Sequence, residues 1–122
     1  MASILVIDDD DQVRDVIYQM LKGAGYEVAQ ASDGKIGVNL YKSAPADLVI
    51  TDILMPNEDG LEAITELRKD FPDVKIIAIS GGGRVVNSDF LNIASSFGAM
   101  KTLKKPFDKK ALLSAVESVL SA

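Results

Sequence analysis

Polar side chains that could do chemistry stand at the ends of four short apolar runs of the sequence. Asp8 and Asp9 come directly after the first run, and Asp52 closes the second. Ser80 ends another such run, and Lys105 follows the last one. If the three carboxylates meet, each pair repels by roughly 4 kcal/mol at ~4 Å and an effective dielectric constant of about 20. Such a site must hold a cation, or keep one carboxyl group protonated.

The residue types that are missing narrow the chemistry. The 122 residues include no histidine and no cysteine, which excludes His-ligated or thiolate metal sites, disulfides, and Ser-His-Asp or Cys-His nucleophiles. An oxygen-only site suits Mg²⁺, which takes one or two carboxylates, keeps several waters and bridges to phosphate oxygens. Lys105 would add a positive charge and Ser80 a hydroxyl donor. Together these groups match phosphoryl transfer to a carboxylate nucleophile.

The overall composition limits the partners and the location. Thirteen basic and eighteen acidic residues give a net charge of −5, and since nucleic-acid binding favours a positive surface, we expect no direct nucleic-acid partner. No apolar run approaches the ~20 residues that span a bilayer, and the N-terminal run is too short for a signal peptide. We therefore expect a single domain over residues 1–122, in the cytoplasm and without membrane contact.

Short β-branched runs alternate with helical patterns along the whole chain, which predicts βα units and a parallel sheet. The expected strands are residues 4–7, 27–31, 48–51, 75–80 and 100–103. Five helices are expected in between and at the end: 11–24, 34–42, 61–69, 88–97 and 109–120. The first of them should bury one face that consists of Val13, Val16, Ile17, Met20 and Leu21.

The expected fold is a doubly wound α/β sheet of the flavodoxin-like type, with five parallel strands in the order 2-1-3-4-5 and five helices. In such a sheet, ligands bind beyond the carboxyl ends of the strands, where the strand order reverses. That point lies between the first and third strands, which end in Asp8, Asp9 and Asp52. Ser80 and Lys105 would reach the same rim from the fourth and fifth strands.

The ordered set of motifs resembles a bacterial response-regulator receiver domain of two-component systems, of the stand-alone, chemotaxis-regulator-like kind. The resemblance covers essentially the whole chain. It rests on ILVIDDD at 4–10, DILMP at 52–56, DGLE at 59–62, ISG at 79–81, GA at 98–99 and LKKPF at 103–107.

The resemblance implies a role for each candidate site residue. Asp52 would accept a phosphoryl group from a phosphohistidine on a sensor histidine kinase or a histidine phosphotransfer protein. Asp8, Asp9, Asp52 and the backbone carbonyl of Leu54 would hold Mg²⁺. Lys105 would contact the phosphoryl oxygens. Ser80 would hydrogen-bond the phosphoryl group and draw its loop inward, shifting an equilibrium between two conformations. Such a protein is a signalling phosphoacceptor, which catalyses only its own phosphotransfer and dephosphorylation.

The resemblance also indicates how the signal would leave the domain. Thr102 stands where receivers commonly carry Tyr or Phe, so we expect the loop and the helix after the fourth strand to carry more of the switch. Lysines such as Lys101 and Lys109 make the C-terminal segment positive. A downstream target protein, with an acidic surface, would bind at about residues 86–121.

Other functions share parts of this pattern. A small haloacid-dehalogenase-like phosphatase would use Asp9 as its nucleophile, with Asp11 and Val13 completing a first motif, but the chain is short for that fold and no acidic pair follows Lys105. A flavin carrier is disfavoured because four successive aspartates would repel the flavin phosphate. An inactive pseudo-receiver, or a receiver excised from a larger regulator or hybrid kinase, stays open.

Overall fold

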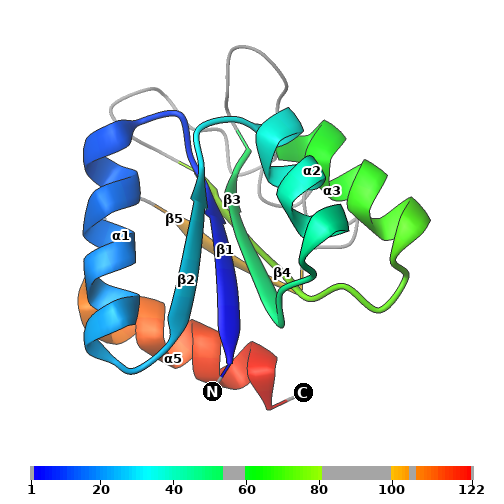
Figure 1. The fold of residues 1–122 in the computed structure, drawn as a ribbon. Coiled ribbons are helices and arrows are strands. Elements are labelled where there is room, and N and C mark those ends of the chain that lie inside the picture. Colours follow the sequence, from blue (N-terminus) through cyan, green and yellow to red (C-terminus); the bar gives the residue numbers. More distant parts are fainter. Residues whose placement is uncertain (1, 54–59, 81–99, 105–106, 122) are drawn as a thin grey trace.

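The computed structural model describes residues 2–53, 60–80, 100–104 and 107–121, and Figure 1 gives the arrangement of their elements. The strands are β1 (Ser3–Ile7), β2 (Glu27–Ala31), β3 (Leu48–Asp52), β4 (Ile76–Ser80) and β5 (Lys101–Lys104). The helices in these ranges are α1 (Asp11–Gly23), α2 (Gly34–Ser43), α3 (Gly60–Asp70) and α5 (Lys109–Leu120). The helix expected at 88–97 lies outside the described residues. Every other expected element is confirmed to within two residues at each end.

The five strands form one parallel sheet in the order β2-β1-β3-β4-β5, which confirms the predicted topology. In its register, Ile7 of β1 pairs with Thr51 of β3, and Asp52 pairs with Ile79 of β4. Asp8 and Asp52 are the residues that come directly after the paired Ile7 and Thr51. They are therefore neighbours at the carboxyl edge of the sheet.

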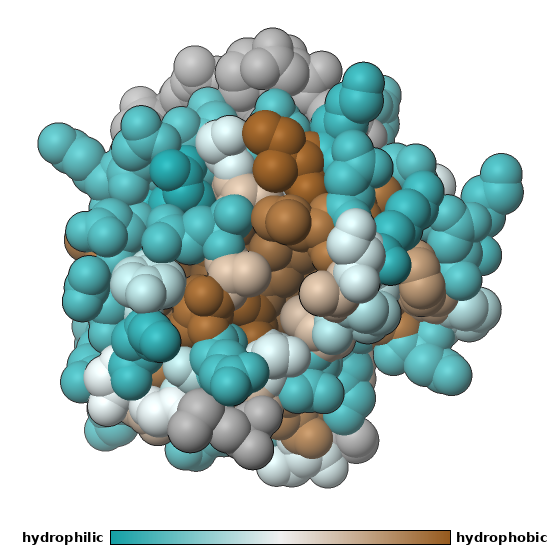
Figure 2. Space-filling view, in the orientation of Figure 1, coloured by the Kyte–Doolittle hydropathy of each residue, from teal (hydrophilic) through white to brown (hydrophobic). Residues whose placement is uncertain are grey.

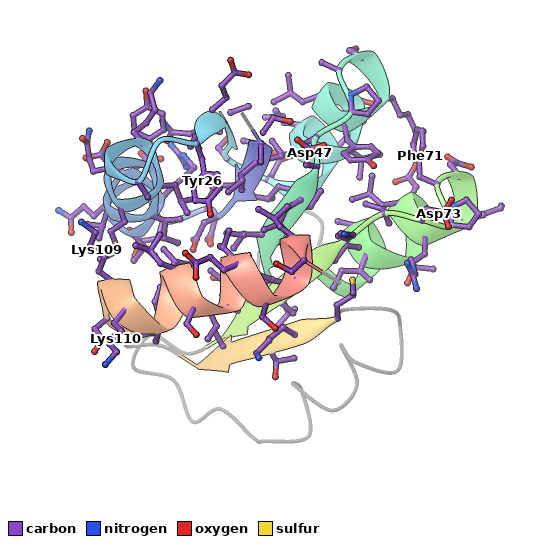
Figure 3. The ribbon with its side chains drawn as sticks, turned by 90° about the horizontal axis from the view of Figure 1, so that it is seen from below. Tyr26, Asp47, Phe71, Asp73, Lys109 and Lys110 are labelled. Atoms are coloured by element: carbon purple, nitrogen blue, oxygen red, sulfur yellow. The ribbon has the colours of Figure 1, made fainter. Side chains whose placement is uncertain are left out.

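Helices cover both faces of the sheet: α1 and α5 lie on one side, and α2 and α3 on the other (Figure 3). The side chains of β1 alternate between the two hydrophobic cores, with Ile4 and Val6 toward α1 and α5 and with Leu5 and Ile7 toward α2 and α3. All four are at most 2 % exposed. A strand buried on both faces has a continuous apolar run, and this is why residues 4–7 of β1 are all apolar.

The expected buried face of α1 was wrong at one position. Ile17 and Leu21 are buried, and Val13 and Met20 pack partly against the same core, but Val16 is 50 % exposed. Successive helical residues differ by about 100° in direction, so Val16 points well away from the direction of Ile17. The apolar stripe is therefore narrower than the pattern predicted.

Aspartate side chains begin three of the helices. Asp10 accepts hydrogen bonds from the backbone N–H groups of residues 12 and 13, Asp33 accepts one from Ile36, and Asp108 accepts one from Ala111. These bonds satisfy donors that a helix start leaves without intrahelical partners. Because Asp10 fixes the start of α1, it also fixes the turn that carries Asp8 and Asp9.

Helix α2 approaches β1 so closely that it needs a glycine. A Cβ atom at Gly37 would lie 2.3 Å from Cδ1 and 2.6 Å from Cγ1 of Ile7, which is fully buried. A methyl group at this position would force either Ile7 out of its place in the core or α2 away from the sheet.

We predict that Gly37→Ala destabilises the fold by about 1–3 kcal/mol, because the core has no room for the added methyl group. Gly23→Ala is the matched control, since nothing lies within 4 Å of a Cβ built there. Urea unfolding measures both changes. Equal stability of the two variants would contradict the close approach of α2 to β1.

Tyr41 packs its ring edge-on against Phe71, with 4.8 Å between the ring centroids, and lies near Asp47 at the amino ends of the strands. Burial, and secondly the charge of Asp47, raise the pKa of the Tyr41 hydroxyl above its ordinary value. The unfolded chain then loses this proton at a lower pH than the folded chain.

The raised pKa predicts a loss of stability in alkali. The contribution of the Tyr41 hydroxyl to the free energy of unfolding is complete below the unfolded tyrosine pKa of about 10. It falls as the pH rises above that value. Urea midpoints between about pH 9 and pH 11 should therefore fall less steeply for Tyr41→Phe than for the wild type. Parallel curves for the two proteins would show that the hydroxyl has no part in the alkaline loss.

Candidate metal and phosphoacceptor site

Three carboxylates meet at the carboxyl ends of β1 and β3. Asp8, Asp9 and Asp52 each offer one oxygen, and these three oxygens lie within 4.8 Å of one another. Sequence positions more than forty residues apart thus share one small volume, as the predicted strand order requires. Asp8 is fully buried, Asp52 is 5 % exposed, and Asp9 is exposed.

Asp8 is held by hydrogen bonds at its backbone N–H, at its carboxylate and at its backbone carbonyl. Its backbone N–H donates to the carbonyl of Ala31 in β2 at 3.1 Å, and its carboxylate Oδ1 accepts from the N–H of Asp10 at 2.9 Å. Arg14 donates from its guanidinium to the Asp8 carbonyl at 2.8 Å and also pairs with Asp11 at 2.6 Å. The turn between β1 and α1 is therefore fixed by both of the elements that it joins and by β2.

Asp52 is the last residue of β3 and is held within the sheet. The N–H of Ile53 donates to the carbonyl of Ile79 at 3.0 Å, so β3 and β4 stay paired past Asp52. The hydroxyl of Thr51 donates to the Asp52 carbonyl at 3.1 Å. The backbone that carries the Asp52 carboxylate is thus fixed between β1 and β4.

The donor set fits a hard divalent cation. All three side chains offer oxygen, and two of them are buried where like charges are weakly screened. A cation among them would offset that repulsion, and Mg²⁺ is the ion that combines few carboxylates with bound waters. The exposed Asp9 gives the group one side that solvent and a phosphate can reach.

The other predicted site residues are described only in part. The backbone of Ser80 ends β4, one residue beyond the partner of Asp52, and pairs with Lys104 in β5. The Ser80 side chain, Leu54 and Lys105 lie outside the described residues. Thr102 is a half-buried residue of β5 that pairs with Ala78, away from the carboxylates in the strand register.

Sequence reasoning missed Arg14, which spans α1, the Asp8 carbonyl and the side chain of Gln30 in β2. Its spacing from Asp11 is typical of a helical ion pair, but a guanidinium that binds a backbone carbonyl leaves no pattern in the sequence.

Comparison with known proteins identifies the class to which this fold and site belong. The family model of the response regulator receiver domain matches residues 4–117, and the chain belongs to this family. Receiver domains are signalling domains of two-component systems, and they bind Mg²⁺ at an acidic cluster of this kind.

Individual relatives agree with the family assignment. The chemotaxis protein CheY of Treponema pallidum is 38 % identical over 120 residues, which cover 96 % of this chain and 81 % of that protein. The transcriptional regulator NtrC of Azospirillum brasilense is 37 % identical over 121 residues, 99 % of this chain but 24 % of that protein. A response regulator receiver domain protein from Clostridium thermocellum has a similar solved structure, with a TM-score of 0.90, 31 % identity, and coverage of 99 % of this chain and 95 % of that one.

The chain spans between an eighth and a half of the length of most of these curated relatives, and 81 % of the length of the Treponema pallidum protein. No helix within the described ranges is long and apolar enough to cross a bilayer.

We predict that Mg²⁺ stabilises this protein through the three carboxylates. Mg²⁺ at about 100 times its dissociation constant should raise the free energy of unfolding by about 2.7 kcal/mol. In Asp8→Asn this gain should be largely lost, while stability without metal should rise because one of three like charges is gone. Thermal unfolding with and without Mg²⁺ measures both effects.

Asp15→Asn is the control for that experiment, because Asp15 is an exposed α1 residue outside the group of three carboxylates. It should keep the full response to Mg²⁺. An equal response of wild type and Asp8→Asn would mean that the ion does not bind where the carboxylates meet.

Proposed function

We propose that Asp52 is the phosphoacceptor of this receiver domain and takes its phosphoryl group from a phosphohistidine on a sensor histidine kinase or a histidine phosphotransfer protein. The observation that carries this proposal is the buried carboxylate of Asp52 beside those of Asp8 and Asp9. Membership of the receiver family supports the reaction class.

In the proposed reaction, a carboxylate oxygen of Asp52 attacks the phosphorus atom of the donor. The bond between phosphorus and the histidine nitrogen breaks, its electron pair stays on the imidazole, and the product is an acyl phosphate on Asp52. Asp8, Asp9, Asp52 and the backbone carbonyl of Leu54 would hold Mg²⁺, which supplies charge neutralisation for the phosphoryl oxygens. Lys105 and the hydroxyl of Ser80 would bind the other phosphoryl oxygens.

Burial favours Asp52 over Asp9 as the nucleophile. Asp52 stands on the rigid end of a central strand, where its oxygen keeps one direction toward an incoming phosphorus atom. Asp9 is exposed and suits a metal ligand that also faces water. The phosphatase alternative, which requires Asp9 as nucleophile, has no support in the family match.

The domain would then act by switching its surface. Phosphorylation would draw Ser80 and its loop inward and shift the region of about residues 86–121 toward the form that binds a target protein. Lys101 of β5 is exposed, and Lys109 and Lys110 lie exposed at the first turn of α5 (Figure 3), so a target with an acidic surface is favoured. Thr102, a half-buried residue of β5 next to Lys101, would take the place of the usual aromatic residue.

We further propose residues 1–122 as one receiver domain of the cytoplasm that acts without direct contact to nucleic acid or membrane. Its only catalysis would be its own phosphotransfer and dephosphorylation. The net charge of −5 supports the absence of a nucleic-acid surface.

We predict that acetyl phosphate with Mg²⁺ adds one phosphoryl group to the wild type, and that Asp52→Asn abolishes essentially all of this adduct. Intact-mass spectrometry measures the yield, and peptide mapping after borohydride trapping locates the acyl phosphate. Chelation of Mg²⁺ should prevent labelling of the wild type as well.

Two further variants separate the acceptor from the metal ligands. Asp9→Asn should slow labelling but leave the adduct on Asp52, and Asp15→Asn should be labelled at the wild-type rate. A full-yield adduct in Asp52→Asn, or an adduct mapped to Asp9, would remove Asp52 as the acceptor.

A further inference from the structure

A cavity of about 430 Å³ lies at the amino ends of the strands, at the edge of the sheet opposite the three carboxylates. Figure 3 looks onto this edge from below. The polar residues of its lining are Tyr41 in the last turn of α2, Asp47 before β3, and Asp73 and Lys75 before β4. Small-molecule sites in proteins have volumes of about 300–1,000 Å³, so the cavity has the size of a site for a small ligand.

Tyr41 gives this cavity a buried polar group that the fold leaves without a partner. Tyr41 is 7 % exposed, and within the described part of the chain its hydroxyl forms no hydrogen bond. Burial, and secondly the charge of Asp47, raise the pKa of this hydroxyl, so the hydroxyl lies within reach of Asp47, which also lines the cavity. Because buried hydroxyl groups nearly always have a hydrogen-bond partner, the cavity is the place where that partner belongs.

The carboxylate of Asp47 is held in a fixed position beside the cavity. Its Oδ2 accepts from the backbone N–H of Ser3 at 2.8 Å, and its own N–H donates to the Ser3 carbonyl at 2.9 Å. Its Oδ1 accepts no hydrogen bond from the residues that the structure describes. Asp47 therefore offers one charged oxygen atom whose direction the start of β1 has already fixed.

The cations nearest in the sequence are bound elsewhere. Lys42 of α2 pairs with two carboxylates of α3, at 3.6 and 3.4 Å. Arg68 of α3 donates to two backbone carbonyls of the segment between α3 and β4, both at 2.9 Å. Neither Asp47 nor Asp73 forms an ion pair with any residue in the described ranges.

Lys75 is the one cation in the described lining, and its ammonium group donates to the carbonyl of Leu120 at the end of α5, at 3.3 Å. The C-terminal ends of α2 and α5 meet at this cavity, since Tyr41 and Leu120 lie in their last turns. Such helix ends carry partial negative charge. Two carboxylates and two helix ends thus face a single ammonium group, which leaves the cavity negative and favours an additional cation.

We propose that this cavity binds a small organic cation that consists of a guanidinium group on a short alkyl chain. The guanidinium donates to the oxygen of the Tyr41 hydroxyl and to Oδ1 of Asp47, and its other N–H groups face Asp73. A guanidinium suits acceptors that come from separate segments, because it carries five donors in one plane and is more weakly hydrated than an ammonium. The alkyl chain packs against Ala46 and Val74.

A second cavity, of about 380 Å³, lies between β1, β2 and α2 and differs in character. Figure 2, in the orientation of Figure 1, shows an apolar strip between polar surfaces on this side of the molecule. The polar side chains of the second lining are those of Ser3 and Glu27, and neither is buried. Because it has no buried polar group to satisfy, this cavity serves as the internal control for the test.

The test uses the full chain and three small compounds of nearly the same shape: butylguanidinium, the uncharged butylurea, and butylammonium. ¹H–¹⁵N NMR follows the backbone amides during titration. We expect saturable shifts at Asp47 and Val74 with butylguanidinium, and none at Val28 of the second cavity. Butylurea should bind about tenfold more weakly because it lacks the charge, and butylammonium several-fold more weakly because it has fewer donors.

Matched variants assign the contacts. Tyr41→Phe keeps the ring and should weaken butylguanidinium binding by about tenfold, whereas Tyr18→Phe on α1 should not. Asp47→Asn should weaken it by a similar factor, whereas Asp15→Asn should not. Lys75→Met should strengthen it several-fold, because a like charge is removed. The NMR spectrum of each variant shows whether it remains folded.

Four results would overturn the proposal. The absence of saturable binding at millimolar butylguanidinium would mean that water alone meets the Tyr41 hydroxyl. Equal affinity for butylurea or butylammonium would remove the guanidinium as the recognised group, and unchanged affinity in Tyr41→Phe would remove the hydroxyl as its acceptor. Tighter binding of a glycine pentapeptide with a central arginine would assign the cavity to a side chain of a partner protein instead of a small molecule.

Discussion

Mutual repulsion of three carboxylates is the constraint around which this fold is organised. Asp8 and Asp52 are buried at the ends of adjacent central strands, and Asp9 lies beside them at the surface. Such an arrangement is unfavourable by itself, because charges out of water interact strongly. It persists because two cores hold both strands in place, because the Asp8 N–H donates to Ala31 and the Asp8 carboxylate accepts from Asp10, and because Ile53 pairs with β4. The same repulsion would favour a cation bound among the three carboxylate oxygens.

The rigidity of the site comes from elements that carry no site residue. β1 has helices on both faces, and the missing side chain of Gly37 lets α2 lie directly against Ile7. The position of Asp8 thus depends on the packing of the preceding residue, Ile7, against Gly37 of α2. On the other face, Arg14 connects α1 to the Asp8 carbonyl and to Gln30. Displacement of either helix would move a ligand atom of the candidate metal site.

Most of the fold could be predicted from the sequence because the decisive signals are local. Residues 4–7 before Asp8 and residues 48–50 before Thr51 and Asp52 are all apolar, as strands covered on both faces require. Three helices begin at aspartates that cap them. Together with the alternation of strands and helices, these signals favour the observed order, and the order brings the three carboxylates together.

What could not be predicted depends on contacts that the sequence does not encode locally. Helical spacing gives the direction of a buried face but not its width, so Val16 was wrongly included. The role of Arg14 was missed because its acceptor is a backbone carbonyl, which every residue has. The cavity of about 380 Å³ between β1, β2 and α2 depends on how far α2 leaves these strands uncovered, and this is a property of the packed structure rather than of any one segment.

The three aspartates that begin α1, α2 and α5 act through an oxygen atom, and their charge is a separate property. Asparagine at Asp10, Asp33 and Asp108 would keep an oxygen acceptor at each helix start, at the cost of about 0.3–1 kcal/mol per position from the helix dipole. The molecule would become three charges less negative with its backbone unchanged. Comparison of the cation affinity of this variant with that of the wild type would measure how much distant charges contribute to cation binding, separately from the three carboxylates at the site.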